Sequence, residues 1–190
     1  FKQAADNAGV EWTLPFISIQ DAPLLGHRGF MLDCARHFFS VEEVKRVLDI
    51  MSLYKLNRLH WHLTDDQGWR VEIPEYPLLT EVGSIRSSSF SNPGDGTVFY
   101  DDTEYGRGMW YSQEQLREVV AYAKARHIEI IPEIDMPGHM VAAITAYPSL
   151  SCDSTKTYSV RILGGISHDV LNVGSDKVID FLKCVLDNIA

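Results

Sequence analysis

Two acids stand close together at the end of an apolar stretch, where acids are uncommon. Residues 128–134 read IEIIPEI, and Glu133 would share one strand face with the following Asp135, because side chains alternate along a strand. Strands inside a parallel sheet are typically apolar throughout. Two carboxylates there therefore need either a structural ion-pair network or a function in a polar pocket. The candidate cations for such a network are Arg28, Arg36 and Arg70.

A second apolar stretch ends in a comparable polar sequence. It reads His60-Trp61-His62-Leu63-Thr64-Asp65-Asp66 and continues into Gln67-Gly68-Trp69-Arg70. Carboxylates can hold sugar hydroxyls while a tryptophan covers the apolar face of the ring, so Asp65, Asp66 and Trp69 predict a carbohydrate site. The alternative is a solvated turn for the acids and core packing for the ring.

A turn after the first acidic pair presents a histidine. Pro137-Gly138-His139 brings the imidazole four residues beyond Asp135. If Asp65 accepts a hydrogen bond from His139, that bond would set the tautomer of the ring. The two apolar stretches would then combine their polar ends in one proton-handling site.

A metal-dependent hydrolase is a competing interpretation of these histidines and acids. His60 and His62 alternate to one face and could chelate one ion, with Asp65 or Asp135 as third ligand. The turn that follows would have no part in such a site, and the three cysteines are too scattered for a zinc site. We therefore predict neither a metal nor a cofactor.

Length and charge exclude several classes of protein. The chain has 190 residues, whereas a complete eight-fold barrel needs about 250. Its formal net charge of −9 disfavours binding to nucleic acids and to anionic membranes. It contains no apolar stretch of about 18 residues, so no membrane span is predicted.

Two segments of one design position the polar ends. Ser40 and Ser112 each open a capping box, which Glu43 and Gln115 complete. Apolar residues follow each cap at offsets of four, seven, eight and eleven, which predicts two amphipathic helices. The strands predicted before, between and after these helices are 29–34, 56–63 and 128–134.

This alternation predicts an α/β fold with a parallel sheet. A third amphipathic helix, opened by Gly174-Ser175-Asp176, completes about three strand-plus-helix units. Long segments at 64–111 and 136–173 follow the carboxyl ends of strands, where barrels place their sites. We therefore predict a partial TIM (β/α)8 barrel over residues 27–190, with long loops at the strand C-terminal ends.

The first residues are expected to be a lead-in. The chain begins Phe1-Lys2-Gln3, without an initiator methionine, and is interpreted as cut from a longer protein. Residues 1–26 would come from a preceding domain. Within them, 12–19 is expected to be an edge strand interrupted by Pro15.

Three motifs together resemble a known enzyme family. They are HRGFMLDCARHF at 27–38, LNRLHWHLTDDQGWR at 56–70 and IIPEIDMPGHM at 130–140. They are similar to the barrel of the beta-N-acetylhexosaminidases of glycoside hydrolase family twenty, over roughly residues 12–189. The resemblance implies removal of terminal N-acetylglucosamine or N-acetylgalactosamine from non-reducing ends with retention of configuration. The nucleophile would be the substrate's own acetamide oxygen.

The resemblance also implies roles for single residues. Asp65 and His139 would form a relay toward a general acid. Arg28 would bind hydroxyls of the terminal sugar, while Glu133 and Asp135 would shape and charge the pocket. The positions implied to contact the substrate are Arg28, Asp66, Trp69, Glu133 and Asp135.

One part of the family pattern is missing. In the family, an Asp-Glu pair after His-x-Gly-Gly orients the acetamide and supplies the general acid. This chain contains no Asp-Glu dipeptide, and its single Gly-Gly, Gly164-Gly165, is followed by Ile166-Ser167. A positioned acid contributes about 10²–10⁴-fold in rate. We therefore expect the chain to be a fragment that ends before that pair and is inactive alone.

The remaining expectations concern partners and location. A non-catalytic carbohydrate-binding or partner-assembled half-barrel is the alternative function. Three strands would leave two sheet edges open, so we expect self-association or pairing with the missing barrel half. The expected ligands are glycans containing N-acetylhexosamine. The family alone implies a secreted, periplasmic or lysosomal protein.

Overall fold

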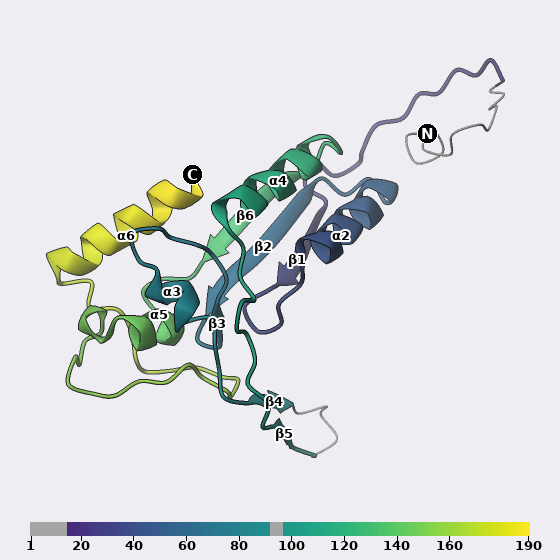
Figure 1. The fold of residues 1–190 in the computed structure, drawn as a ribbon. Coiled ribbons are helices and arrows are strands. Elements are labelled where there is room, and N and C mark those ends of the chain that lie inside the picture. The colour runs from purple at the N-terminus through teal and green to yellow at the C-terminus, as the bar shows by residue number, and fades with distance from the viewer. Residues whose placement is uncertain (1–14, 92–96) are drawn as a thin grey trace.

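The computed structural model describes residues 15–91 and 97–190. Its elements alternate strand and helix, with two long segments inserted (Figure 1). In chain order they are β1 (Gly29–Asp33), α2 (Val41–Leu53), β2 (Arg58–Asp65), β3 (Gly68–Trp69), α3 (Leu78–Glu81), β4 (Ser89–Ser91), β5 (Phe99–Asp101), α4 (Gln113–Lys124), β6 (Glu129–Ile134), α5 (Val141–Ala146), a 3-10 turn (Pro148–Leu150) and α6 (Asp176–Ile189).

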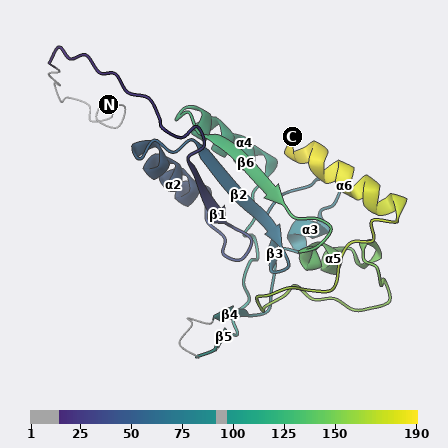
Figure 2. The same ribbon diagram turned by 180° about the vertical axis from the view of Figure 1, so that it is seen from behind.

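The central sheet confirms the predicted parallel arrangement. Its order is β1–β2–β6, with β2 in the middle and the short β3 antiparallel to β2 (Figure 2). The register pairs Asp33 of β1 with His62, and pairs His62 with Glu133 of β6. The carboxyl ends of all three strands therefore meet at one edge, which collects the polar residues that follow them.

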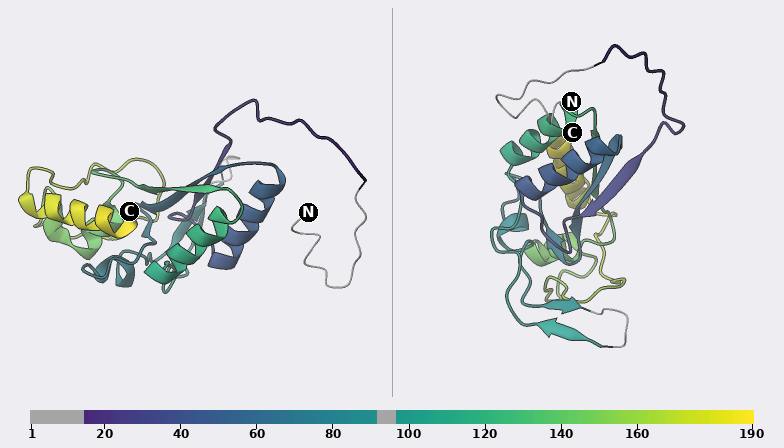
Figure 3. Two further views of the ribbon diagram at one scale, coloured as in Figure 1. Left: turned by 90° about the horizontal axis from the view of Figure 1, so that it is seen from above. Right: turned by 90° about the vertical axis from the view of Figure 1, so that its right-hand side faces the viewer.

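Both predicted capping boxes are present. Ser40 opens α2 and Ser112 opens α4, and each side chain accepts a hydrogen bond from the third residue of its helix. The helices also end alike, because Lys55 and His127 adopt left-handed backbone conformations with φ of +56° and +58°. This shared design lays α2 and α4 side by side on one face of the sheet (Figure 3).

The core lies between these helices and β2. Leu59, Trp61 and Leu63 alternate along β2 and are all buried, and they face the buried Val44 of α2 and Val119 of α4. The intervening histidines, His60 and His62, point to the opposite face. Helical spacing and strand alternation therefore give the sheet an apolar face, which α2 and α4 cover, and a polar face, which carries the histidines.

Some element boundaries differ from the sequence-based expectation. β2 begins at Arg58 rather than at residue 56, because Leu56 and Asn57 are used to end α2 and to bind Arg28 N. It extends to Asp65 because Thr64 pairs with Trp69 of β3. Of the expected edge strand at 12–19, residues 12–14 lie outside the described residues, and 15–19 form no strand.

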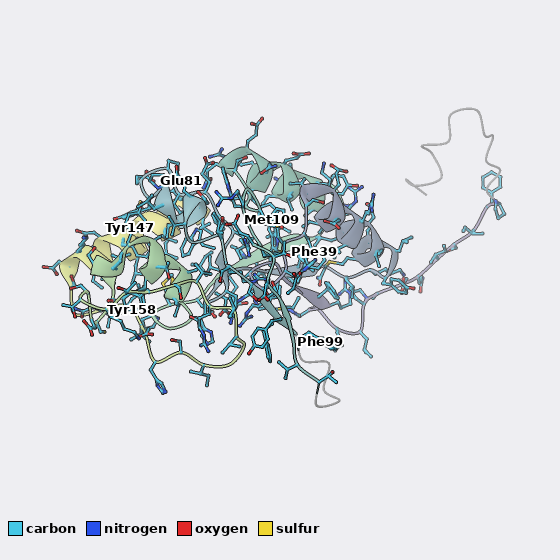
Figure 4. All side chains as sticks on the ribbon, turned by 60° about the horizontal axis from the view of Figure 1, so that its bottom comes forward. Phe39, Glu81, Phe99, Met109, Tyr147 and Tyr158 are labelled. Carbon is cyan, nitrogen blue, oxygen red and sulfur yellow. The ribbon has the colours of Figure 1, made fainter. Side chains whose placement is uncertain are left out.

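The two long segments contain short elements of their own. The first carries α3 and the β4–β5 hairpin, on which Phe99 lies, and the second carries α5 and ends at α6 (Figure 4). Within the described part of the chain, every helix is too short or too polar to cross a bilayer.

Candidate active site

Asp65 is the centre of the polar cluster at the end of β2. Its side chain is 1% exposed, and its Oδ2 lies 2.6 Å from Arg36 Nη2 and 3.0 Å from His62 Nε2. Its Oδ1 lies 3.1 Å from His139 Nδ1 and accepts a 2.7 Å hydrogen bond from the backbone N–H of Asp66. Each carboxylate oxygen therefore has two partners.

These partners keep Asp65 ionised. Burial alone would raise the pKa of Asp65, but hydrogen bonds from His62 and Asp66 N–H and the charge of Arg36 outweigh it and lower that pKa. An ionised carboxylate only accepts hydrogen bonds, so His139 Nδ1 must carry the proton in this contact. In the neutral ring, the lone pair is then on the other nitrogen, Nε2.

The turn after β6 delivers His139 to this carboxylate. The peptide between Met136 and Pro137 is cis, and His139 has a φ of +57°, which residues other than glycine rarely adopt. The imidazole remains 40% exposed although its partner Asp65 is buried. The predicted hydrogen bond between Asp65 and His139 is thus present in the structure, and the ring stays partly exposed.

Glu133 sits beside two histidines of the central strand. His62 Nδ1 lies 2.7 Å from Glu133 Oε2, and His60 Nε2 contacts the same oxygen. Burial acts to lower the pKa of His62, but hydrogen bonds to Asp65 and Glu133 outweigh it and raise that pKa. Burial likewise opposes ionisation of Glu133, yet its contact with His62 lowers the pKa of Glu133. His62 therefore bridges the ends of β2 and β6, and its contacts with the two acids favour the imidazolium form.

Asp135 differs from the other acids of the cluster. Burial and the neighbouring Glu133 carboxylate raise the pKa of Asp135. It is half-buried, and one of its carboxylate oxygens lies within 4.8 Å of a ring nitrogen of His62 and of a carboxylate oxygen of Asp65. The pKa of Asp135 is thus shifted in the opposite direction from those of Asp65 and Glu133.

Asp66 is buried rather than directed toward a ligand. Its side chain is 0% exposed, Oδ1 accepts a hydrogen bond from Val141 N at 3.2 Å, and Oδ2 lies 3.2 Å from Arg161 Nη1. Both oxygens are used within the protein. The expected contact between Asp66 and a substrate stays a prediction, although the structure already gives each oxygen a partner.

Trp69 contradicts the sequence-based expectation. Its ring is fully buried, packs against Phe181 of α6, and donates its indole N–H to Val71 O at 2.6 Å. A ring enclosed in this way offers no face to a sugar. Pairing of Thr64 with Trp69 in β3 turns the side chain into the core, which the linear sequence did not reveal.

The structure does not bring Arg28 to the cluster. Its guanidinium donates to Leu25 O and Lys55 O at the amino end of β1. That end is five residues before Asp33, or roughly 16 Å along the strand at 3.3 Å per residue. The predicted sugar contact of Arg28 stays a prediction.

Arg36 is the residue whose importance the sequence left open. It contacts Asp65, pairs with Asp33 Oδ2 at 2.8 Å and donates to Gln67 Oε1 at 2.9 Å. Arg36 therefore forms ion pairs with Asp33 and Asp65, and not with Glu133 or Asp135, the acids for which an ion-pair network was the alternative. Its signal was the Asp33-x-x-Arg36 spacing directly after a strand, which places acid and cation on one turn.

The other buried arginines hold the first long segment against the site. Arg70 donates only to backbone carbonyls, including those of Ala35 and Ser84, and burial lowers its pKa to about 10. Arg86 donates to Arg36 O, and the Tyr105 ring lies under its guanidinium at 3.9 Å. Arg70 and Arg86 thus support the backbone that carries Arg36 and contact no acid of the cluster in the structure described.

Two sets of donor atoms have spacing that a metal ion could use. They comprise His62, Asp65 and Asp135, and Asp65, Asp66 and His139. Arg36 already lies 2.6 Å from Asp65 and 3.3 Å from His62 Nε2, so a cation occupies that side of the first set. His60, a ligand in the competing interpretation, belongs to neither set. The arrangement favours ion pairing and proton transfer.

The comparisons with known proteins identify the family of this chain. Residues 25–190 match the model of the glycosyl hydrolase family 20 catalytic domain, so the chain belongs to that family. It is 48% identical over 178 residues to a beta-hexosaminidase of Porphyromonas gingivalis, covering 94% of this chain and 21% of that protein. It is 46% identical over 141 residues to the N,N'-diacetylchitobiase of Vibrio harveyi, covering 70% of this chain and 16% of that protein.

Solved structures support the same assignment. A crystal structure of a beta-N-acetylhexosaminidase superposes with a TM-score of 0.77 at 41% identity, covering 89% of this chain and 34% of that one. The exo beta-N-acetylglucosaminidase of Vibrio harveyi in complex with N-acetylglucosamine gives 0.74 at 44% identity, covering 89% and 26%. The chain thus spans about a quarter to a third of these structures.

Proposed function

We propose that this chain supplies the first strand-plus-helix units of a (β/α)8 barrel that hydrolyses terminal N-acetylglucosaminides or N-acetylgalactosaminides. The single observation that carries the proposal is the contact between buried, ionised Asp65 and His139, whose Nε2 is left to exchange a proton. The similarity to proteins named beta-hexosaminidase and chitobiase supports the substrate class.

In the proposed reaction the substrate's acetamide oxygen attacks the anomeric carbon while a general acid protonates the leaving oxygen. Asp65 orients His139 through the hydrogen bond to Nδ1. His139 Nε2 forms a hydrogen bond with the general acid, so the charge of Asp65 influences the pKa of that acid through the imidazole. Glu133 and Asp135 line the sugar pocket, where their carboxyl groups can hydrogen-bond to the sugar. The acid itself would follow a His-x-Gly-Gly motif that these 190 residues do not contain.

Chromogenic N-acetylglucosaminide is the direct test. We expect the pure 190-residue chain to give no turnover above buffer, because the acid is missing. We further expect the parent reading frame to encode His-x-Gly-Gly-Asp-Glu downstream, and its product to hydrolyse the substrate. Turnover by the isolated chain, or a parent frame without that motif, would contradict the proposal.

A matched pair of variants in the parent product locates the relay. Asp65→Asn keeps the shape of the side chain but removes its charge, and we expect a loss of kcat of about 10²-fold or more. Asp101→Asn changes an exposed acid of β5 in the same way and should leave kcat unchanged. Equal activity of both variants would exclude Asp65 from the relay.

The open edge of β6 supports a continuation of the barrel. Among the described strands, β6 pairs only with β2. A groove of about 1370 Å³ lies beside it between α4 and α6, lined by apolar residues that include Leu116, Val120, Ile130 and Leu186. We propose that the missing barrel half, or a second copy of this chain, covers this edge.

Light scattering tests that part of the proposal. We expect the isolated chain to self-associate or to be poorly soluble, because exposed strand edges pair with other chains. A stable monomer at high concentration would contradict it. Secretion, or delivery to the periplasm or a lysosome, is proposed from family membership alone and is tested by fractionating the source cells.

A further inference from the structure

The buried carboxylate of Asp66 has no role in the chemistry described above. Its partners are Val141 N, at the start of α5, and Arg161, which lies in the segment between the 3-10 turn and α6. Arg161 contacts Asp66 a second time through the backbone, since the N–H of Arg161 donates to the carbonyl oxygen of Asp66 at 3.0 Å. This contact joins residues 95 positions apart in the sequence.

Asp66 contacts Asp65 directly and is hydrogen-bonded to the chain just after His139. Its N–H donates at 2.7 Å to Asp65 Oδ1, the same oxygen that lies 3.1 Å from His139 Nδ1. Its carboxylate holds the N–H of Val141, which follows His139 by only two residues. Asp66 therefore fixes the acceptor on one side and the strained turn that carries the ring on the other.

We propose that Arg161 and Asp66 are positioning residues that together hold His139 in the tautomer with the proton on Nδ1. The inference rests on the proposed function, in which Nε2 must be free to act on the general acid. The inference adds that the segment 151–175, which contains Arg161, determines which nitrogen of the His139 ring carries the proton.

The charges around the two acids explain why Arg161 is needed. Asp65 faces Arg36, His62 and His139, whereas Asp66 faces only Arg161 among the ion pairs of the described residues. Without Arg161, a second buried carboxylate would stand next to Asp65 without a counter-ion, which is costly. The Asp66 side chain would then reorient toward another donor, and would release Val141 N and the turn at His139.

The test uses the 190-residue chain with ¹⁵N-labelled histidine, at a pH where His139 is neutral. The ¹⁵N shifts of the ring report the tautomer directly. We expect the Nδ1–H form of His139 to dominate in the unchanged chain. Arg161→Gln should raise the Nε2–H population at least threefold and should speed hydrogen exchange of the Val141 amide at least tenfold.

Two further variants separate positioning from a general loss of structure. Arg161→Lys keeps the charge but loses the planar guanidinium, so its Nδ1–H population should lie between those of the unchanged chain and of Arg161→Gln. Lys156→Gln removes a cation from the same segment, where it pairs with Asp169 at 2.6 Å, and should change neither readout. If Arg161→Gln does not fold, the Arg161→Lys variant decides the question. An Nδ1–H population of His139 between that of the unchanged chain and an even mixture of tautomers supports the proposal. An unchanged Nδ1–H population overturns it.

Other outcomes also overturn the proposal. An unchanged tautomer in folded Arg161→Gln would do so, and so would equal effects of Arg161→Gln and Lys156→Gln. Neither readout requires hydrolysis. An inactive parent protein with the tautomer coupling intact would refute the proposed function and leave this inference standing.

Discussion

The carboxyl ends of β2 and β6 carry acids of opposite character, although they lie side by side. Asp65, at the end of β2, is buried, and its contacts with His62, Asp66 N–H and Arg36 lower its pKa. Asp135, just after β6, is half-buried beside Glu133, and its pKa is raised. The charge of Asp65 is thus compensated by groups of the chain itself, whereas Asp135 is destabilised in its ionised form and stays partly accessible to a ligand.

The difference shows how one sheet edge can serve two purposes. Permanent ion pairs fix the geometry of Asp65 and His139, because their charges are compensated before any ligand arrives. Asp135, just after β6, is instead repelled by the neighbouring carboxylate of Glu133. Acids with perturbed pKa values of this kind are common at binding and catalytic sites. The predictions below test each side of this contrast, beginning with the largest effect.

Removing Trp69 should have the largest effect on stability. Its fully buried ring packs on Phe181, so Trp69→Ala should lower the free energy of unfolding by about 3–5 kcal/mol. Urea unfolding followed by circular dichroism measures the loss. Trp110→Ala, at a half-buried ring, should cost clearly less. A loss under about 1 kcal/mol for Trp69→Ala would mean that this end of the sheet is not core.

Neutralising Asp65 should weaken the β2 end. Asp65→Asn leaves Arg36 and His62 without their shared anion, and we expect the free energy of unfolding at pH 7 to fall by about 1.5–3 kcal/mol. The same urea experiment measures it, with Asp101→Asn as the exposed control. If both substitutions cost the same, the pairing at Asp65 contributes nothing to stability.

The bridge between the two ends should depend on pH through His62. Its pKa is raised in the folded chain, so its contribution is fully present below the ordinary histidine pKa of about 6.5 and is lost as pH rises through the folded value. Each unit of that rise corresponds to about 1.4 kcal/mol. The gap in unfolding free energy between the unchanged chain and His62→Gln should therefore narrow from pH 6 to pH 9. His168→Gln, at an exposed ring, should show no such trend. A gap that widens with pH would contradict the imidazolium bridge.

The smallest effect, and one of opposite sign, is expected at Asp135. Asp135→Asn removes the repulsion from Glu133, and we expect the free energy of unfolding at pH 7 to rise by less than about 1 kcal/mol, since the pair is partly exposed. Thermal unfolding at pH 7 and pH 4 measures it, and the gain should shrink at pH 4 as the acid becomes protonated. A destabilised Asp135→Asn at pH 7 would show that the β6 end is as well compensated as the β2 end.

The sequence predicted those parts of the molecule that depend on local pattern. The capping boxes at Ser40 and Ser112 act over three residues, and strand alternation placed Glu133 and Asp135 on one face. Asp65 and His139 were brought together correctly because parallel strands end at the same edge, so spacing alone limits where their side chains can lie.

The residues that the sequence missed act through long-range contacts. Arg161 reaches Asp66 across 95 positions, from a segment without regular structure, and no spacing rule connects them. Trp69 was assigned to a sugar site because its neighbours are polar, but the two-residue strand β3 turns it inward. Such placements depend on how the long segments fold back, which local propensity does not determine.

Carbon-13 NMR of the aspartate side chains tests the central contrast most directly. The carboxyl carbons of Asp65 and Asp135 can be followed from pH 2 to pH 8 in the isolated chain, with Asp65→Asn and Asp135→Asn used to assign them. The account predicts that Asp65 titrates below the ordinary aspartate pKa of 3.8 and that Asp135 titrates above it. Equal pKa values for the two acids, or the reverse order, would contradict it.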